Sequence, residues 1–199
     1  ERLLAEGHAV TVIDNYSTGR PENLAHLTDN PNLTIVEAQI EDQATIRPLF
    51  EGVDWVFHMA ALADIVPSIK QPQAYHSANV NGTLSVLEAA RAGGVKRLVY
   101  AASSSCYGVP DIYPTPETSP TDPQYPYALA KYVGEQYVMH WCQLYGLPAV
   151  SLRMFNIYGP RSRTSGTYGA VFGVFLAQKL ASEPFTVVGD GSQTRDFTF

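Results

Sequence analysis

Three serines and a tyrosine–lysine pair are the residues whose types and spacing most clearly suggest chemistry. The serines, 103–105, come at the end of an apolar run that reads as a buried strand, and Tyr127 and Lys131 lie four positions apart in a predicted helix. Residues at i and i+4 project from one face of a helix. A lysine ammonium beside a phenol stabilises the phenolate and lowers the pKa of the tyrosine. The trio Ser103, Tyr127 and Lys131 predicts removal of a proton from a secondary alcohol while a hydride leaves its carbon.

A surface tyrosine–lysine pair would show the same spacing, which is common by chance. The order of the motifs favours the catalytic interpretation, because the serines end a central strand and the Tyr127–Lys131 pair opens the next long helix. Agreement between the strand, the helix and the residue types is stronger evidence than the pair alone.

Asp14 closes the first visible strand and is followed by the turn residues NYSTG. In a nucleotide-binding sheet, an acid at the tip of the second strand accepts hydrogen bonds from the adenosine ribose and favours NAD over NADP. The glycine-rich turn that precedes such a strand is expected upstream of Glu1. An aspartate that merely caps a turn fits the same residues, and both interpretations stay open at this point.

Apolar runs and helical segments alternate along the chain, which predicts a doubly wound parallel sheet of the Rossmann-like type. The predicted strands are continuous apolar runs, which is typical of strands covered on both faces. They span 9–14, 33–40, 53–61, 97–103 and 148–155, and the predicted helices span 43–52, 74–94, 125–146 and 170–181. Asn79 lies inside a predicted helix, where asparagine is a poor former. Its amide could bond a strand carbonyl, kink the helix, hold a water or face solvent.

The chain reads as an α/β fold in two parts. Residues 1–160 are predicted to form the dinucleotide-binding domain without its first strand, and residues 161–199 the start of a smaller substrate-binding subdomain. Because the sequence begins inside a helical pattern and ends in the apolar run RDFTF, we expect it to be cut at both sides.

Composition excludes several classes of protein. The 199 residues carry a net charge of −6, which disfavours nucleic-acid binding through a basic face. No apolar run is long enough for a membrane span, and no His, Cys or acid spacing suggests a metal. The two cysteines, Cys106 and Cys142, fit a reduced cytoplasmic setting better than a disulfide framework. Cys106 is interpreted as a small buried thiol, and His58 as a core histidine.

At this point the chain resembles the extended short-chain dehydrogenase/reductase family, in its NAD-dependent nucleotide-sugar epimerase/dehydratase group. Within the group it is most similar to the UDP-sugar 4-epimerases, including those that act on N-acetylated sugars. The matching segments come in family order: VIDNYSTG, VFHMAA, NVNGT, YAASSSCYG, YPYALAK, SLRMFNIYGPR and GDGSQTRDF.

The resemblance implies a role for each matching residue. Tyr127 would be the base, Lys131 its electrostatic partner, and Ser103 the third catalytic residue. The NAD site would be lined by Asp14, Asn15, Thr18, Gly19, Ile40, Ala60, Ala61, Asn79, Tyr127 and Lys131. The UDP-sugar would be contacted by Ser103, Ser104, Tyr127, Asn156 and Arg195, the last through its forked guanidinium on the phosphates. Gln39 stands where the family often has an acid near adenine, and Met154 contributes no hydroxyl.

The resemblance also bears on the reaction. The family's 4,6-dehydratases carry Asp-Glu directly after the catalytic Ser/Thr position and its decarboxylases a Glu in that region, whereas this chain has Ser104 and Ser105. Epimerisation through a 4-keto intermediate is therefore favoured over dehydration and decarboxylation, and UDP-glucuronate 4-epimerisation stays open. A catalytically silent NAD-binding protein is the alternative of another class, which such relatives reach by losing Tyr or Lys. A homodimer built through the helices VLEAARAGG and YVGEQYVMHW is expected.

Overall fold

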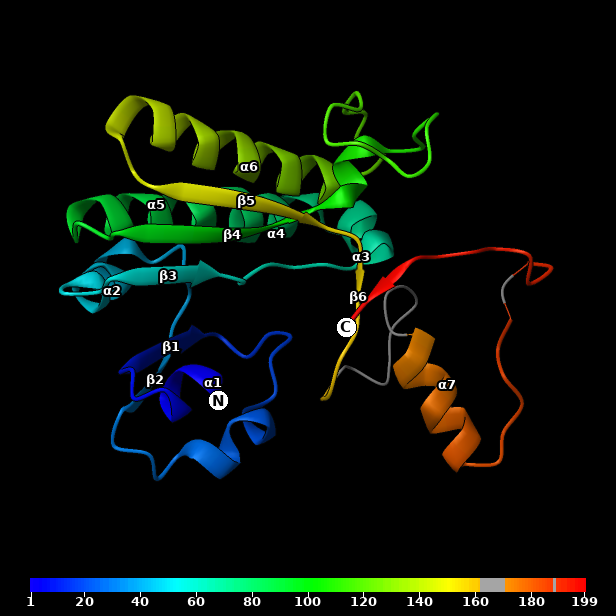
Figure 1. Ribbon diagram of the computed structural model, residues 1–199, viewed down its shortest axis with the longest axis horizontal. Helices are drawn as coiled ribbons and strands as arrows, with labels where there is room; N and C mark the ends of the chain where they lie inside the picture. The colour runs from blue at the N-terminus through cyan, green and yellow to red at the C-terminus, as the bar shows by residue number, and fades with distance from the viewer. Residues whose placement is uncertain (162–170, 188) are drawn as a thin grey trace.

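The computed structural model describes residues 1–161, 171–187 and 189–199, in which every pair of neighbouring strands runs parallel. Figure 1 shows the helices α5 (Gly82–Ala92) and α6 (Pro126–Tyr145) packed along one group of strands, with α7 (Val171–Leu180) standing apart from them. The strands are β1 (Val10–Asp14), β2 (Leu33–Glu37), β3 (Trp55–His58), β4 (Arg97–Ser103), β5 (Ala149–Met154), β6 (Asn156–Ile157) and β7 (Phe197–Thr198). The α-helices are α1 (Arg2–Ala5), α2 (Gln43–Ile46), α3 (Ile65–Lys70), α4 (Pro72–His76), α5 (Gly82–Ala92), α6 (Pro126–Tyr145) and α7 (Val171–Leu180). Shorter helical turns are η1 (Pro21–Asn23), η2 (Ala25–Leu27), η3 (Arg47–Phe50), η4 (Ser77–Asn81) and η5 (Ser104–Tyr107).

The described strands form three small sheets. β1 pairs with β2, β3–β4–β5 form a second sheet, and β6 pairs with β7. In the doubly wound order 3-2-1-4-5-6, the first two sheets correspond to the two halves on either side of strand 1. The parallel, strand–helix–strand architecture predicted from the sequence is therefore confirmed.

The central strand β4 carries the residues that begin the site. It pairs with β3 from Trp55↔Arg97 to His58↔Tyr100 and with β5 from Leu98↔Ala149 to Ser103↔Met154. The predicted strand 97–103 matches β4 at both ends. Because side chains alternate along a strand, Leu98, Tyr100 and Ala102 point into the buried core.

Helix α6 covers β4 and β5 and carries the tyrosine–lysine pair. It starts at Pro126, whose missing N–H costs nothing in the first turn, and it ends at Gly146 in the left-handed conformation with φ 67°. The core between α5, α6 and the sheet consists of closely packed apolar side chains, including Leu87, Val138 and Leu98, all with no exposed surface. This packing sets the distance between α6 and β4.

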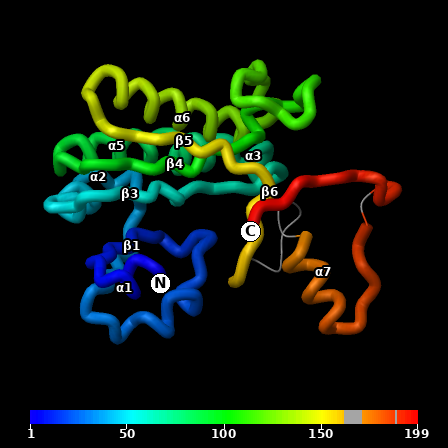
Figure 2. Tube along the Cα trace, viewed as in Figure 1, coloured from blue at the N-terminus to red at the C-terminus, as the bar shows by residue number. Residues whose placement is uncertain are grey.

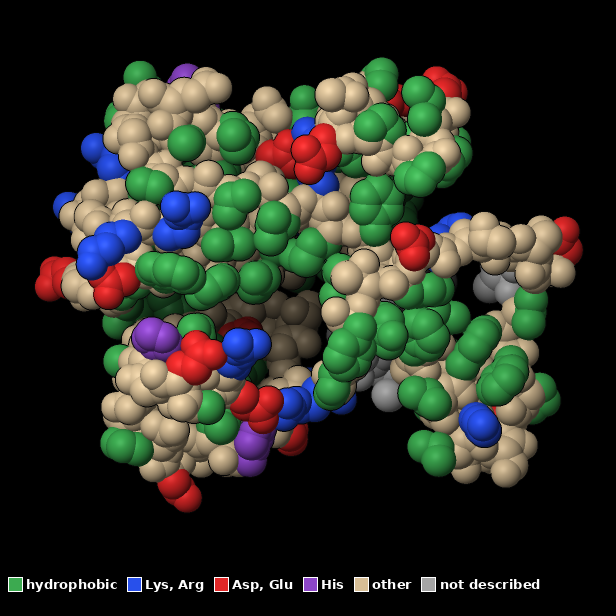
Figure 3. Space-filling model, in the orientation of Figure 1, with side chains coloured by type: hydrophobic (Ala, Val, Ile, Leu, Met, Phe, Trp, Pro, Cys, Tyr) green, Lys and Arg blue, Asp and Glu red, His purple; other side chains and the backbone are tan. Residues whose placement is uncertain are grey.

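One prediction about the sheet is wrong within the described residues: only one face of β3–β4–β5 is covered. On the other face Trp55 is 61% exposed, Phe57 44% and Leu152 45%. Figure 3 shows hydrophobic side chains gathered over these strands and a hollow between them and the part that holds β1 and β2. Continuous apolar strands indicate two buried faces, but no described helix packs on this one.

Several boundaries differ from the prediction. The strand predicted for 33–40 ends at Glu37, that for 53–61 shortens to β3, and the helix predicted for 74–94 divides into α4, η4 and α5. The middle piece, η4, is a π-helical turn around Asn79. The segment predicted as one helix, 43–52, divides into α2 and η3, because Pro48 removes a backbone donor. Helix α3, which the apolar pattern did not indicate, fills the connection after β3.

The last part of the chain turns away from the three-stranded sheet. Figure 2 shows the tube continuing from β5 through β6, and the C-terminal segment returning beside it. Helix α7 confirms the helix predicted there, while most of the segment RSRTSGTYG lies outside the described residues. The domain boundary at 160 stays a prediction. Of the helices in the described part of the chain, none has the length and apolar character needed to cross a bilayer.

Candidate active site

Ser103 and Tyr127 lie close together at the carboxyl end of β4, and Lys131 follows one helical turn further along α6, over the Tyr100 ring. Ser103 is the last residue of the strand, and Tyr127 and Lys131 lie in the first two turns of α6. The Ser103 hydroxyl oxygen accepts hydrogen bonds from the Ser105 backbone N–H at 3.2 Å and from the Ser105 hydroxyl at 2.8 Å. The Ser103 side chain also lies close enough to Tyr127 to lower the pKa of its phenol. The fold therefore brings together the serine and the tyrosine that the sequence analysis paired.

The environment of Tyr127 raises its pKa, which corrects one step of the sequence argument. Burial disfavours the phenolate and is the largest cause, the Ser103 side chain lowers the pKa, and the charge of Asp64 raises it. The predicted lowering by Lys131 is wrong for this structure, because the lysine ammonium lies over a different ring. Aromatic side chains surround the phenol, with the rings of Tyr75 and Tyr125 each 6.4 Å from the Tyr127 ring.

Lys131 is a buried lysine, with 4% of its surface exposed. Its Nζ lies 4.4 Å from the centre of the Tyr100 ring, a cation–π contact. Burial lowers the pKa of Lys131 to about 8, against an opposing effect of Glu135. A lysine in this state is still protonated near neutral pH.

Asp14 ends β1 and is surrounded by a tight turn. Its Oδ1 accepts the backbone N–H of Tyr16 at 2.8 Å, so the turn-cap interpretation is confirmed. A Cβ on Gly19 would stand 2.6 Å from Asp14 Oδ2. The glycine therefore allows the backbone to approach the carboxylate, as a close-fitting ligand site requires. Asn15 donates from Nδ2 to Gln39 Oε1 at 2.7 Å. Gln39, which stands where the family often has an acid, therefore holds the Asn15 side chain. Thr18 is exposed.

Asn79 is buried and organises the loop after β3. Its Oδ1 accepts the backbone N–H of Leu62 at 2.8 Å, and its Nδ2 donates to the Leu62 carbonyl at 2.9 Å. The loop that carries Ala60 and Ala61 is thus held by Asn79 rather than by sheet hydrogen bonds. The amide bonds a carbonyl, although that of Leu62 in the loop after β3 rather than one in a strand, and the solvent-facing alternative is wrong. Ile40 packs against Gly82 at the start of α5, where the absence of a side chain leaves room for it.

The expected substrate residues lie in two places. Ser104 begins η5 directly after Ser103 and is half-buried. Asn156, in β6, donates from Nδ2 to the backbone carbonyl of Asp196 at 2.9 Å. Arg195, the sequence neighbour of Asp196, is exposed and donates to the carbonyl of Thr194. The structure therefore brings Asn156 beside the Arg195 segment, and no described contact joins either of them to Ser103 or Tyr127.

Two charged residues next to the site were missed by the sequence analysis. Glu135 and Arg153 form an ion pair with an Nη2–Oε1 distance of 2.6 Å. Glu135 lies four residues after Lys131, a spacing that repeats the Tyr127–Lys131 interval and that could have indicated it. Arg153 sits in an apolar strand, where an arginine is unusual unless it is paired.

The interpretations of His58 and Cys106 are confirmed. His58 is 4% exposed, its Nε2 lies 2.9 Å from the Thr83 hydroxyl, and burial lowers its pKa to about 3. Cys106 is 1% exposed and burial raises the pKa of its thiol, which is the opposite of an activated nucleophile. Within residues 1–161, 171–187 and 189–199, no three His, Cys, Asp or Glu side chains are placed to hold a metal.

This arrangement suits a bound dinucleotide. A carboxylate at the tip of β1, with a glycine allowing close approach, fits a ribose diol. A hydroxyl, a phenol and an ammonium group at the end of β4 fit an alcohol whose proton must move. A shallow hollow lined by Trp55, Lys96, Arg97, Val99 and Val150 lies toward the opposite end of the sheet, and none of these residues belongs to the site.

Comparisons with known proteins identify the family of this chain. The NAD dependent epimerase/dehydratase family matches residues 1–199. The chain is similar to the UDP-glucose 4-epimerase of Mycolicibacterium smegmatis, with 38% identity over 100% of this chain and 64% of that protein. The chain thus spans less than two thirds of that relative's length.

Two solved structures are also similar. One is a UDP-N-acetylglucosamine 4-epimerase from Methanobrevibacter ruminantium in complex with UDP-N-acetylmuramic acid, with a TM-score of 0.91 and 36% identity over 96% of this chain and 61% of that one. The other is the Thermus thermophilus UDP-glucose 4-epimerase in complex with NAD, with a TM-score of 0.82 and 35% identity over 92% of this chain and 58% of that one.

Proposed function

Because this chain belongs to the NAD-dependent epimerase/dehydratase family, we propose that the protein containing it interconverts the C4 epimers of a UDP-hexose through a 4-keto intermediate. The observation that carries the proposal is the placement of Ser103 at the end of β4 beside Tyr127, whose pKa it lowers, with Lys131 one helical turn further along α6.

In this proposal each residue has one task. The Tyr127 oxygen takes the proton of the 4-hydroxyl, the Ser103 hydroxyl bonds the same sugar oxygen, and the Lys131 ammonium stabilises the phenolate when substrate is bound. Bound NAD would supply the reversible hydride acceptor for C4. After the keto sugar has turned, Tyr127 gives its proton back to the C4 oxygen. Proton and hydride are both returned, so the reaction has no net oxidation.

The cofactor residues follow the same proposal. Asp14, Asn15, Thr18 and Gly19 would hold the adenosine ribose, with Ile40 beside adenine. The loop of Ala60 and Ala61, held by Asn79 through Leu62, would approach the cofactor closely, because alanine side chains leave room. Asn156 and Arg195 would contact the sugar nucleotide.

Epimerisation is preferred to dehydration or decarboxylation because both of those need an additional acid or base after the catalytic serine. Ser104 and Ser105 occupy these places, and the Ser105 hydroxyl donates to Ser103 Oγ at 2.8 Å. A serine hydroxyl is a poor proton donor for expelling hydroxide.

We further propose a cytoplasmic homodimer that buries part of α5 and α6, where Met139 and Leu144 are exposed. Light scattering on the full-length protein tests this.

The test uses the full-length protein with UDP-glucose, UDP-N-acetylglucosamine and UDP-glucuronate offered separately. We expect one of them to be epimerised at C4, and Tyr127→Phe to lose at least about a thousandfold in kcat with unchanged NAD binding. Tyr125→Phe, a neighbouring phenol on the same helix end, is the matched control and should keep most activity. Full turnover by Tyr127→Phe, or the alkali absorbance of a 4-keto-6-deoxy sugar among the products, would contradict the proposal.

A further inference from the structure

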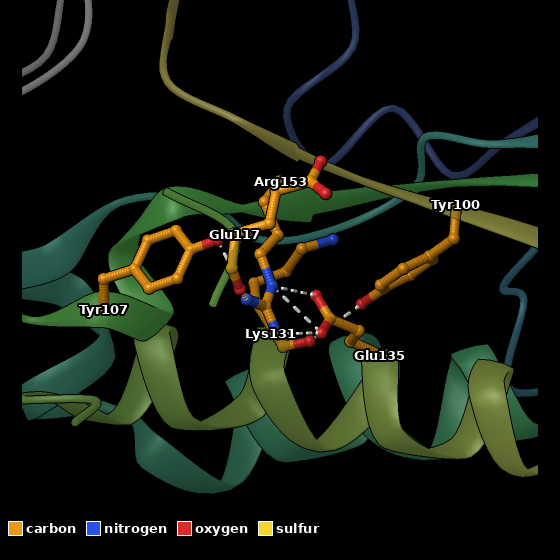
Figure 4. Close-up of polar contacts among 6 residues, drawn as sticks. All are labelled: Tyr100, Tyr107, Glu117, Lys131, Glu135 and Arg153. Carbon is orange, nitrogen blue, oxygen red and sulfur yellow. Dashed lines mark hydrogen bonds and ion pairs between the residues drawn. The ribbon is translucent and has the colours of Figure 1, made fainter. Parts of the chain in front are cut away.

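A buried ion pair lies directly behind Lys131. The Arg153 Nε lies 3.0 Å from each carboxylate oxygen of Glu135, and Nη2 lies 2.6 Å from Oε1. The side chain of Glu135 is 5% exposed and that of Arg153 22%. Figure 4 shows the guanidinium from β5 reaching down to the carboxylate on α6, with Lys131 beside it. Burying such a pair costs desolvation free energy, so its presence does not by itself indicate a contribution to stability.

Arg153 also binds the segment that follows the catalytic serine. Its Nη1 donates to the Tyr107 hydroxyl at 2.9 Å and to the carbonyl of Glu117 at 3.5 Å. The guanidinium carbon lies 4.9 Å from the centre of the Tyr107 ring. One side chain therefore connects β5, helix α6 and the η5 turn that continues from Ser103.

Glu135 acts on Lys131 without bonding to it. The two residues are one turn apart on the same face of α6, and the carboxylate raises the pKa of Lys131 against the effect of burial. Nevertheless, within the described residues no carboxylate oxygen lies within 4.0 Å of Lys131 Nζ, which instead lies over the Tyr100 ring. The carboxylate is turned toward Arg153.

The groups around Lys131 come from four elements, and Glu135 is the anion among them. On α6 they are Tyr127 and Glu135, on β4 Tyr100, on β3 His58 and on β5 Arg153. Tyr100 is a neutral phenol because burial raises its pKa, and His58 is neutral because burial and the charge of Lys131 lower its pKa to about 3. Changes in the charge or position of Glu135 should therefore dominate the titration of Lys131.

We propose that Arg153 is a positioning residue that holds the Glu135 carboxylate near Lys131 but out of bonding range, so that the lysine remains charged while its Nζ stays available to Tyr127 and the cofactor. This inference rests on the proposed function for its purpose, but its physical content concerns only this chain. If Arg153 were absent, the Glu135 side chain would be free to rotate toward Lys131, one helical turn away, and bond its ammonium directly.

The proposal predicts opposite effects for the two partners. Glu135→Gln removes the negative charge and should lower the titration midpoint of Lys131, whereas Arg153→Gln should raise it because Glu135 then bonds the ammonium. We expect a change of about threefold or more in proton affinity in each direction. The midpoint is measured by NMR on the full-length protein labelled with ¹³C-lysine, and the Lys131 signal is assigned by its absence in Lys131→Arg.

Glu88→Gln is the matched control, because Glu88 also pairs with an arginine, Arg91, and accepts a bond from Trp141. It should leave the Lys131 midpoint unchanged. The alkaline limb of the kcat–pH profile should move with the midpoint in Glu135→Gln. In Arg153→Gln, kcat should fall about tenfold or more at every pH because the ammonium is held away from the site.

The outcomes separate this inference from the proposed function. Midpoints that fall in both variants, or that do not move, would overturn it, whatever the enzyme activity. Opposite shifts in a protein without epimerase activity would uphold the electrostatic device and reject the proposed reaction. If Arg153→Gln does not fold, Arg153→Lys keeps the charge but not the two-point bond; an unchanged midpoint and full kcat in that variant would also overturn the proposal.

Discussion

Gly19 lies against the carboxylate of Asp14 so closely that a Cβ at position 19 would stand 2.6 Å from Oδ2 and 3.0 Å from the carboxyl carbon. The two residues are five apart in sequence and are joined by the turn that follows β1. A side chain at residue 19 would therefore require the Asp14 carboxylate or the turn to move.

Gly19→Ala should weaken NAD binding by about tenfold, because the Asp14 carboxylate or the turn must move, and a loss of about 1.4 kcal/mol in binding is tenfold. Binding is measured by calorimetry on the full-length protein after removal of any cofactor that copurifies. Ser17→Ala is the control, because Ser17 is exposed and only its backbone N–H is used in the turn. Equal affinities for the two variants and the parent would contradict the role given to Gly19.

Lys131→Met should stabilise the protein at neutral pH while abolishing turnover. Because burial lowers the pKa of Lys131 from 10.5 to about 8, the lysine is protonated in both the folded and the unfolded states below about pH 8. The full cost of burying the charge is then present. Between that pH and 10.5 the folded state loses its proton first, so the cost fades and the stability of the parent rises. At pH 7 the variant should gain about 2 kcal/mol in free energy of unfolding.

The measurement is denaturant unfolding at pH 7 and pH 11, with Lys70→Met on the exposed surface as the control. The gain of Lys131→Met should disappear at pH 11. In the same pH range, turnover by the parent should decline as pH rises through about 8, because the ammonium is the working form of Lys131. A gain that is equal at the two pH values would refute the assignment of this pKa to Lys131.

Gly134→Ala should destabilise the protein by about 1–3 kcal/mol, the usual cost of overpacking. A Cβ at position 134 would stand 2.5 Å from the Tyr100 hydroxyl and 3.0 Å from the Asn79 carbonyl oxygen, which is backbone and cannot turn aside. Gly82→Ala is the comparison, because its Cβ would meet the flexible end of Ile40 at 2.6 Å. We expect the second variant to lose less stability in thermal unfolding. The reverse order would show that α6 does not depend on this close approach.

The local parts of the site could be predicted from the sequence, because they depend on spacing within one element. Tyr127 and Lys131 share a face of α6 since they are four residues apart in a helix, and Ser103 ends a strand whose apolar pattern marks it as central. Asp14 and Gly19 lie in one turn. The long, regular elements β4 and α6 were predicted nearly to the residue, whereas the helix around Asn79 was divided by a π-turn that no propensity indicates.

Only the tertiary structure decided the ion pairing and the direction of the pKa shifts of these residues. Arg153 is 18 residues from Glu135 and 46 from Tyr107, and no local pattern joins positions on a strand, a helix and a turn. The direction of the Tyr127 pKa shift was likewise wrong from sequence, because burial and the placement of Lys131 over Tyr100 depend on how α6 packs on β4. Spacing along the chain determined which groups share a face; desolvation and long-range packing, which exist only in the folded chain, determined their charge.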